Sequence, residues 1–491
     1  MGDADSRSGS DLLAERREKL ERLRSEGVEA FPHDFDGRTP IADVRAAHEG
    51  LAAGEDTDAS YRVAGRLVAR RGHGKSAFLD LEDGTGKIQL HSQADLMGEE
   101  KHEALLHVDL GDLIGVEGTA FATRKGELSI RIGSWELLAK SLRPPPDKFH
   151  GLEDVETRYR RRELDLIAND ETRELFRKRA AAVSAAREWL DGRGFLEVET
   201  PVLQPLYGGA LARPFTTHHN ALDRDLYLRI ATELYLKRLI VGGLDRVYEM
   251  GKDFRNEGVS HKHNPEFTML EWYEAYADYN DAAERLEQLV AFVAERVNGT
   301  TQIERDGREI DLAPPWKRLT LRDAIRERSG IDIAEHPTRE ALAGAMDSEP
   351  DPEEGWGKLV DGLLSKEVEP NLVEPTFILD YPVEMSPFAK DHRREEGLVE
   401  RWEAFVGGIE IANAFSELND PDEQRRRFEQ QASEQARGDE EVQPYDESYV
   451  EALEQGMPPT GGVGLGIDRL VMLLTGAQTM REVLLFPVMR T

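Results

Sequence analysis

Residues 251–279, with the sequence GKDFRNEGVSHKHNPEFTMLEWYEAYADY, constrain the fold of this chain of 491 residues more than any other segment. Two runs of strand-forming residues flank a loop rich in Asn, Gly, Ser, His and Lys, with turn signals at Gly258 and Asn264. The pattern predicts strand, loop, strand. Arg255 in this hairpin can hold a phosphate or a carboxylate by two parallel hydrogen bonds, and Phe267 can stack on a flat ring. The segment therefore suits a nucleotide beside an amine-bearing acid, although a solvated hairpin whose charges pair with one another would have the same composition.

This segment resembles motif 2 of the class II aminoacyl-tRNA synthetases, in the letters FRNEG and HNPEFTMLE. The surrounding sequence is similar to the lysyl-tRNA synthetase branch of that family, in the letters ELYLKRLIVGGLDRVYEMG around its start and YEAYADY at its end. Residues 194–201 resemble motif 1, and residues 461–476, which contain GVGLGIDR, resemble motif 3. The three motifs stand in the order of the family, and the resemblance covers nearly the whole chain after residue 10.

The part of the chain before residue 144 has the pattern of a separate β-barrel domain. From about residue 61 to residue 142, five short runs of β-forming residues alternate with glycine turns, and a helical insert is expected at 97–107. This pattern fits an OB-type barrel, a common oligonucleotide-binding module. A stiff proline-rich linker, LRPPPD, follows it. We therefore expect an α+β protein with an N-terminal helical extension at 1–57, an OB-fold anticodon-binding domain at 58–143, a linker at 144–157 and, at 158–491, a class II catalytic domain with an antiparallel sheet and a helical insertion at about 320–374.

The net charge of −33 and the absence of cysteine limit the possible functions. Without cysteine the chain has no disulfide, no zinc–thiolate site and no cysteine nucleophile. We find neither an apolar run long enough to span a bilayer nor a signal peptide, so the simplest compartment is the cytoplasm, with no membrane partner. A strongly acidic chain is an unusual partner for tRNA, because nucleic-acid binders carry basic faces. A halophilic host, in which high salt screens acidic surfaces, would explain the charge.

The resemblance also implies roles for individual residues of the catalytic domain. It places Arg255 between the α-phosphate of ATP and the carboxylate of lysine, and Arg469 on the γ-phosphate, as the two catalytic residues. The ATP-binding residues that it implies are Arg255, Glu257, His263, Asn264, Phe267 and Arg469. The lysine-binding residues that it implies are Gly209, Glu233, Arg255, Glu271, Tyr273, Asn413 and Glu417, with Glu233 on the α-amino group and Glu417 on the ε-ammonium group.

Glu403 and Glu410 are the candidate metal ligands. They lie seven residues apart across a Gly-Gly turn, and two carboxylates brought close repel each other unless a cation lies between them. Hard oxygen ligands beside a triphosphate suit Mg²⁺, although two surface glutamates are also common in so acidic a chain. The resemblance assigns both residues to Mg²⁺ and ATP.

Four residues of the barrel domain, by the same resemblance, contact anticodon bases: Arg71, Phe78, Gln89 and Glu127. The chemistry agrees, because an aromatic ring stacks on a base while an arginine and an amide bind its edge. The alternation of FLDL around Phe78 would equally allow this residue to pack in the core.

The activity that the resemblance implies is the formation of lysyl-adenylate from L-lysine and ATP, and transfer of lysyl to the 3′ end of tRNA(Lys), by a homodimer joined through motif 1 with Mg²⁺ as cofactor. An aspartyl- or asparaginyl-tRNA synthetase would need cations where this chain has glutamates. A paralogue that modifies a protein lysine would lack the OB domain. A binding module without catalysis is disfavoured by the intact Arg255, Glu403, Glu410 and Arg469.

If the acidic surface is an adaptation to salt, raising KCl from low to multimolar concentration should strengthen both folding and lysine-dependent ATP–pyrophosphate exchange, because screening weakens self-repulsion. Thermal unfolding and exchange rates measured across one salt series check this expectation. Folding and activity that stay unchanged across the series would remove the halophilic interpretation.

Overall fold

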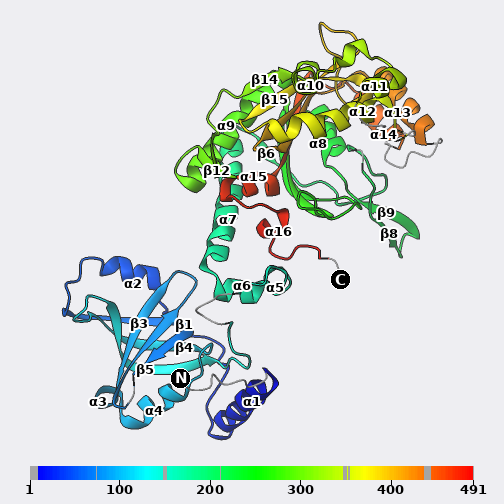
Figure 1. The fold of residues 1–491 in the computed structure, drawn as a ribbon. Coiled ribbons are helices and arrows are strands. Elements are labelled where there is room, and N and C mark those ends of the chain that lie inside the picture. Colours follow the sequence, from blue (N-terminus) through cyan, green and yellow to red (C-terminus); the bar gives the residue numbers. More distant parts are fainter. Residues whose placement is uncertain are drawn as a thin grey trace. The chain divides into compact units, whose positions relative to one another are not determined.

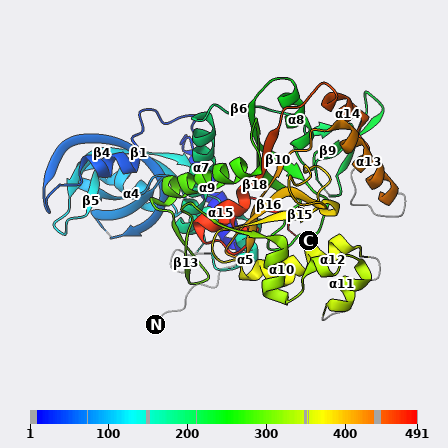
Figure 2. The ribbon, with the colours of Figure 1, turned by 90° about the horizontal axis from the view of Figure 1, so that it is seen from above.

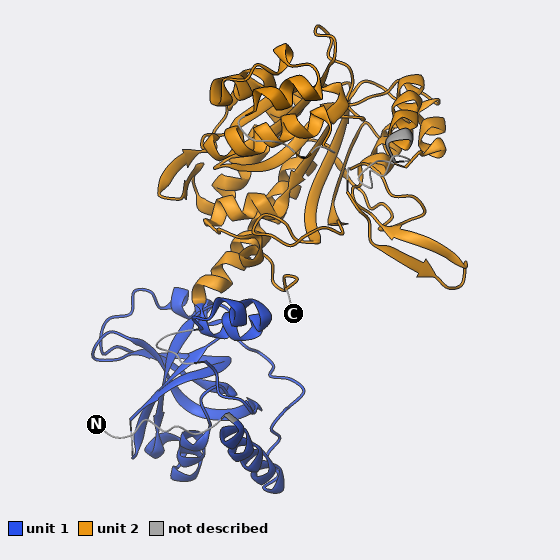
Figure 3. Ribbon diagram, turned by 45° about the vertical axis from the view of Figure 1, so that its right-hand side comes forward, with its two compact units in different colours: residues 1–169 blue, residues 170–491 orange. Residues whose placement is uncertain are grey.

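The computed structural model describes residues 9–72, 74–146, 152–210, 212–346, 351, 354–435 and 444–489. Within them the chain forms two compact units, residues 1–169 and residues 170–491 (Figure 3). The start of the expected N-terminal extension, residues 1–8, and residues 147–151 of the expected linker lie outside the described residues.

The first unit contains a closed five-stranded barrel with the strand order β1-β2-β3-β5-β4 (Figure 1). Its strands are β1 (Asp56–Arg71), β2 (Ser76–Glu82), β3 (Lys87–Gln93), β4 (Leu113–Ala122) and β5 (Leu128–Ala139). Alternate residues point inward, so that Leu79 and Leu81 of β2 and Leu90 of β3 are fully buried. The helices α3 (Ala94–Met97) and α4 (Glu99–His107) separate β3 from β4. The expected OB-type barrel and its helical insert are therefore confirmed, with the insert beginning at Ala94.

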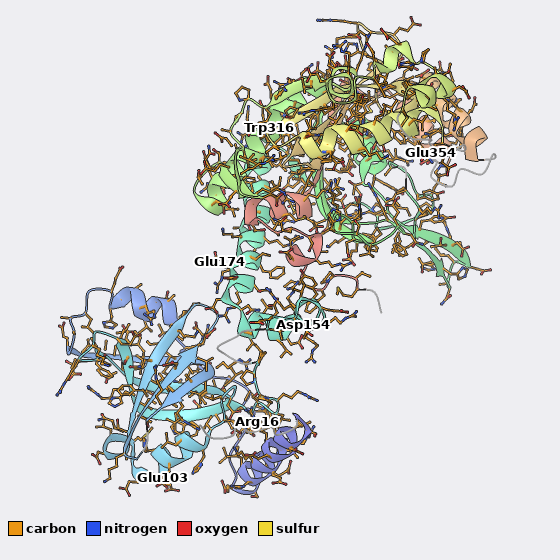
Figure 4. The ribbon with its side chains drawn as sticks, in the orientation of Figure 1. Arg16, Glu103, Asp154, Glu174, Trp316 and Glu354 are labelled. Atoms are coloured by element: carbon orange, nitrogen blue, oxygen red, sulfur yellow. The ribbon has the colours of Figure 1, made fainter. Side chains whose placement is uncertain are left out.

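Four further helices belong to this unit: α1 (Gly9–Ser25), α2 (Ile41–Ala47), α5 (Val155–Arg160) and α6 (Arg162–Ala168). Arg16 of α1, labelled in Figure 4, donates hydrogen bonds to the carbonyl oxygens of Ser141 at 2.9 Å and Leu110 at 3.0 Å. These bonds fasten α1 to the end of the barrel. The helices α5 and α6 belong to this first compact unit, which ends at Asn169.

The second unit is organised around an eight-stranded sheet with the order β14-β15-β16-β17-β18-β11-β10-β6. Neighbouring strands are antiparallel except in the pairs β14–β15 and β10–β6, which confirms the expected antiparallel sheet. The strands are β6 (Leu196–Glu197), β10 (Arg246–Phe254), β11 (Glu266–Ala275), β14 (Lys317–Thr320), β15 (Thr376–Pro382), β16 (Leu398–Val406), β17 (Ile409–Ser416) and β18 (Thr460–Gly466).

Three helices, α7 (Asp170–Asp191), α9 (Tyr279–Asn298) and α15 (Ile467–Thr475), cover one face of this sheet (Figure 2). The strand β11 sends Leu270 and Trp272 into the apolar core that these helices complete. Because side chains alternate along a strand, Glu271 and Tyr273 face the other side of the sheet. The hydrophobic pattern of β11 therefore separates a packed face from a polar one.

Smaller elements complete the second unit. They are a hairpin of β12 (Gln302–Arg305) and β13 (Arg308–Asp311), a small sheet of β7 (Leu203–Gln204), β8 (Thr216–His219) and β9 (Arg224–Leu228), and the helices α8 (Glu233–Val241), η4 (Val383–Met385), α13 (Pro421–Gln435), α14 (Glu447–Leu453) and α16 (Met480–Val483). The insertion expected at about 320–374 is helical, as α10 (Leu321–Ser329), η1 (Ile333–Glu335), α11 (Arg339–Ala345), α12 (Trp356–Leu363), η2 (Leu364–Val368) and η3 (Glu369–Asn371). Among the described residues, no helix combines the length and hydrophobicity needed to cross a bilayer.

Trp402 of β16 is fully buried, donates from its indole nitrogen to the Tyr279 carbonyl at 2.6 Å and meets the ring of Phe377 edge to face. We expect Trp402→Ala to lower the unfolding free energy of the second unit by about 3–5 kcal/mol, through the cavity and the lost bond. Denaturant unfolding followed by circular dichroism measures this loss. The matched control is Leu222→Ala at an exposed hairpin tip, which should change stability by less than about 0.5 kcal/mol. A loss below about 1 kcal/mol for Trp402→Ala would contradict the assigned packing.

Candidate active site

The polar face of the large sheet carries a cavity of about 390 Å³, within the range of small-molecule sites. Residues of β11, β16, β17 and β18 line it, together with the loop between β10 and β11 and the start of α15. Every catalytic-domain residue that the sequence analysis singled out as a candidate ligand contact lines this one cavity: Gly209, Glu233, Arg255, Glu257, His263, Asn264, Phe267, Glu271, Tyr273, Glu403, Glu410, Asn413, Glu417 and Arg469.

Arg255 directly follows β10, where the predicted strand, loop and strand are confirmed. Its backbone N–H donates to the Pro265 carbonyl at 2.9 Å, which closes the base of the loop. Its guanidinium group lies 5.1 Å from the centre of the Phe267 ring, and its buried Nε atom has no hydrogen-bond partner among the described residues. The loop thus presents a cation with unused donor capacity beside an aromatic ring.

Arg469, in the first turn of α15, also lines the cavity. Its Nη1 atom donates to the Glu410 carboxylate at 2.8 Å, and its Nη2 atom lies 3.5 Å from Nε2 of His263. Burial lowers the pKa of His263 and the neighbouring Arg469 lowers it further, so the imidazole is neutral at pH 7. The Asp468 carboxylate accepts from the Thr268 N–H at 2.7 Å and fixes the start of α15 against β11.

Glu403 and Glu410 lie on adjacent antiparallel strands, joined by a turn in which Gly407 and Gly408 have φ of +58° and +71°. Glu403 accepts from Tyr381 at 2.9 Å and from Arg401 at 2.5 Å. Burial raises the pKa of Glu403 to about 7 against the effect of Arg401, and the like charge of Glu410 adds to the rise. Burial would also raise the pKa of Glu410, but the nearby Arg469 outweighs it and lowers that pKa.

This carboxylate pair fits a hard divalent cation only in part. The described residues contain no group of three or more His, Cys, Asp or Glu side chains arranged to hold a metal. Glu403 and Glu410 can therefore supply two oxygen ligands to Mg²⁺, and the remaining ligands must come from phosphate oxygens or water.

The inner end of the cavity holds three buried carboxylates: Glu233, Glu271 and Glu417. Burial raises the pKa of both Glu271 and Glu417 to about 8, and neighbouring carboxylates contribute to each rise. Glu271 accepts from the Tyr273 hydroxyl at 3.3 Å. A cation bound beside a buried carboxyl group favours its ionised form, so this end of the cavity suits ammonium groups.

Glycines of β18 form the floor beneath these carboxylates. Gly462 pairs with Tyr273 and Gly464 pairs with Glu271 across β18 and β11. A Cβ atom on Gly462 would lie 2.0 Å from Oε1 of Glu417 and 2.4 Å from Cε1 of Tyr273. The glycine-rich sequence therefore leaves room for the buried side chains in a strand, unlike the glycines of a dinucleotide-binding loop.

Asn264 has a structural use in addition to its place on the cavity wall. Its amide nitrogen donates to the Glu266 carbonyl at 2.6 Å, and its amide oxygen accepts from the Val488 N–H at 3.3 Å. The side chain therefore joins the loop to the C-terminal segment.

The sequence analysis missed two residues that organise the cavity. Arg401 donates to Asn413 at 3.2 Å and to the Ser386 hydroxyl at 2.7 Å, besides binding Glu403. Lys237 lies behind the cavity and contacts both Glu233 and Glu417. The spacing of both residues could have indicated these contacts. Arg401 lies two residues before Glu403, and residues two apart share a face of a strand; Lys237 lies four residues after Glu233, and residues four apart share a face of a helix.

The candidate anticodon contacts lie on or beside the outer surface of the barrel. Phe78 lies between the inward-facing Ala77 and Leu79, is not part of the barrel core, and stacks on His91 with ring centres 4.4 Å apart. The other three already have partners: Arg71 binds Asp80 at 2.8 Å, Gln89 accepts from Ser129 at 3.0 Å, and Glu127 lies 3.3 Å from Arg45. Cross-strand pairing brings Arg71 opposite Phe78, whereas Glu127 lies just before β5.

Both parts of the chain match known protein families. Residues 154–490 match the family described as tRNA synthetases class II (D, K and N), and residues 61–138 match the OB-fold nucleic acid binding domain. Proteins named lysine–tRNA ligase are similar over almost their full length. The one from Synechococcus sp. is 53% identical over 98% of this chain and 99% of its own, and the one from Moorella thermoacetica is 51% identical over 98% of each.

A third such protein, from Thermoanaerobacter sp., is 50% identical over 98% of this chain and 96% of its own. The relatives are not from halophiles, so the halophilic interpretation of the acidic charge is unsupported. The match of the family over more than half of the chain, the antiparallel sheet and the barrel together lead to one conclusion: this chain belongs to the class II tRNA synthetases of the D, K and N group.

Proposed function

We propose that this chain is a lysine–tRNA ligase, which joins L-lysine to ATP as lysyl-adenylate and transfers the lysyl group to the 3′ end of tRNA(Lys). The observation that carries the proposal is the polarity of one cavity, with arginines at its outer end and the three buried carboxylates Glu233, Glu271 and Glu417 at its inner end. An amino acid with two ammonium groups and one carboxylate matches this polarity. The names of the similar proteins support the same substrate.

In the first step, a lysine carboxylate oxygen attacks the α-phosphorus of ATP, forms a new P–O bond and displaces pyrophosphate. The step needs no nucleophile from the protein, so the protein contributes position and charge neutralisation. Arg255 would contact both the lysine carboxylate and the α-phosphate, and Arg469 with His263 would hold the outer phosphates. Phe267 would stack on adenine, and Glu257 would accept from its amino group.

Glu403 and Glu410 would hold Mg²⁺, Glu410 through the oxygen that Arg469 does not bind and Glu403 through a second lone pair of an oxygen already bonded to Arg401 or Tyr381. When bound, the ion would supply positive charge to the phosphates during the displacement. Asn264, whose amide is bonded within the chain, would shape the phosphate-binding loop as well as line it.

Selectivity for lysine would follow from the cost of leaving a buried carboxylate unpaired. A neutral side chain beside Glu417 would leave the charge uncompensated, at a cost of about 1–3 kcal/mol or more. An aspartate or asparagine substrate would need a cation at this place, and the inner cavity wall offers carboxylates instead.

The proposed assembly is a cytoplasmic homodimer. The support is apolar surface near motif 1, where Leu196 is 51%, Val202 41% and Leu203 46% exposed. Exposed apolar side chains close together in the sequence are consistent with a subunit interface there. On the barrel, the half-buried ring of Phe78 supports contact with anticodon bases, in spite of the acidic net charge.

L-Lysine should support ATP–pyrophosphate exchange, whereas leucine and methionine should be rejected at least about tenfold to a hundredfold because they leave Glu417 unpaired. Ornithine should be rejected less. Exchange rates with each amino acid at equal concentration test this. Equal rates with leucine and lysine would contradict the substrate assignment, and no exchange with any amino acid would point to a binding module without catalysis.

Arg255→Ala should lower the exchange rate about 10²–10³-fold, because it removes the donor placed at the reacting phosphate, and should leave the fold intact. Arg255→Lys should recover only part of the rate, since an ammonium group lacks the two-pronged geometry. The control is Arg326→Ala in α10, an exposed arginine outside the cavity. An Arg255→Ala variant that retains most of its rate would show that the role given to Arg255 is wrong.

A further inference from the structure

Lys237 is a fully buried cation for which the proposed reaction has no use. It lies in α8, four residues after Glu233, with no exposed surface and with Nζ 5.2 Å from the centre of the Phe388 ring. It is not among the residues that line the cavity. A buried ammonium group is expensive unless carboxylates compensate it, so its partners define what it does.

Those partners are two of the three carboxylates at the inner end of the cavity. The Nζ atom of Lys237 lies 2.5 Å from Oε1 of Glu233 and also contacts Oε2 of Glu417. These two residues come from different elements, the start of α8 and the segment after β17. One ammonium group therefore joins the two carboxylates from behind.

This arrangement leaves one oxygen of each carboxylate for the cavity. Oε1 of Glu417 is buried, has no hydrogen-bond partner among the described residues and lies above Gly462 on the cavity floor. The second oxygen of Glu233 is likewise not the one bound to Lys237. Lys237 thus orients both carboxylates and occupies only their rear oxygens.

The net charge of this cluster also matches lysine. When ionised, Glu233, Glu271 and Glu417 carry three negative charges, and Lys237 cancels one of them. Two negative charges remain, which equal the two ammonium groups of L-lysine. Without Lys237, three buried carboxyl groups would face the two ammonium groups of bound lysine, and one of them would keep a proton at neutral pH even with the substrate in place.

We propose that Lys237 is a positioning residue that sets amino-acid selectivity, by holding Glu233 and Glu417 toward the cavity and by leaving two negative charges for a substrate with two ammonium groups. The proposal rests on the proposed function, because it takes L-lysine as the substrate. It extends that function to a residue that touches neither substrate nor ATP.

Lys237 remains charged at neutral and moderately alkaline pH. Burial alone would lower its pKa, but Glu233 and Glu417 outweigh burial and raise it. The other titratable groups around this cluster are Tyr449 on α14, Glu271 and Tyr273 on β11 and, beside Glu271, Asp253 on β10, which lies 3.1 Å from Arg229. The pKa values of both tyrosines are raised by burial and by nearby carboxylates, so neither ionises near neutral pH. Glu271 and Glu417 titrate in the range from pH 7 to pH 9 in the wild type as well, and so does the α-amino group of the substrate, so the effect of Lys237 is the difference between the pH profiles of the variant and the wild type.

The test is Lys237→Met, which keeps most of the side-chain volume and removes the charge. ATP–pyrophosphate exchange is measured from pH 7 to pH 9 with L-lysine and with 6-hydroxynorleucine, in which a hydroxyl replaces the ε-ammonium group. At pH 7 we expect KM for lysine to rise about tenfold or more with a smaller change in kcat, and the ratio of kcat/KM for lysine to that for 6-hydroxynorleucine to fall about tenfold. Raising the pH should reverse part of the KM increase, because the carboxyl group that keeps its proton in the variant at pH 7 then ionises.

Arg238→Met is the matched control. Arg238 is the next residue of α8, and it binds Asp446 and Ser448 instead of the cavity carboxylates. This variant should keep the wild-type selectivity ratio and the wild-type pH profile. A Lys237→Met variant with an unchanged ratio and no pH-dependent recovery of KM would overturn the proposal.

Lys237→Gln, which can still donate a hydrogen bond without a charge, is measured in parallel in case the methionine variant does not fold. It should lose the same selectivity. If neither Lys237 variant folds while Arg238→Met does, Lys237 serves stability alone and the proposal is overturned. A wild-type protein that fails to use lysine would refute the proposed function itself, which is a separate and recognisable result.

Discussion

The register of β11 is the constraint on which the rest of the catalytic unit depends. Leu270 and Trp272 pack into the core beneath α7, α9 and α15, and the intervening Glu271 and Tyr273 face the cavity. Pairing with β10 on one side and β18 on the other holds this alternation in place. A slip by one residue would turn Trp272 into the cavity and Glu271 into the apolar core, which would destroy both at once.

The same alternation explains the distribution of charge. Buried carboxylates are costly, and the unit compensates them with a small number of buried or half-buried cations. Arg401 binds Glu403, Arg469 binds Glu410, and Lys237 binds Glu233 together with Glu417. Each cation orients a carboxylate while it neutralises it. In a chain with a net charge of −33, this pairing keeps the cavity at a defined charge.

Two glycines of the cavity, Gly462 and Gly209, lie directly beside long side chains that line it. The close approach of Glu417 and Tyr273 to Gly462 leaves no room for a Cβ atom. Gly209, with φ of +88°, passes so close to Glu233 that an added Cβ would lie 3.0 Å from the Glu233 Cβ. These glycines allow long side chains to reach the inner end of the cavity, which supports the depth of the proposed lysine site.

Local sequence patterns were sufficient to predict much of the fold. Alternating β-forming residues and glycine turns were enough to predict the barrel, and the turn residues around Gly258 were enough to predict strand, loop and strand, because these signals are local. The resemblance to a known family identified residues that line one cavity, although they come from segments as distant as Gly209 and Arg469.

Tertiary structure alone decided which groups meet. It joined Lys237 to Glu417 and used the amide of Asn264 to hold the C-terminal segment. It also placed Phe78 on the outer surface of the barrel, whereas the alternation in the sequence allowed either the core or the outer surface. One physical cause explains all three. Spacing along a helix or strand tells which residues share a face, but the partner on the opposite side belongs to another part of the chain and is chosen by packing.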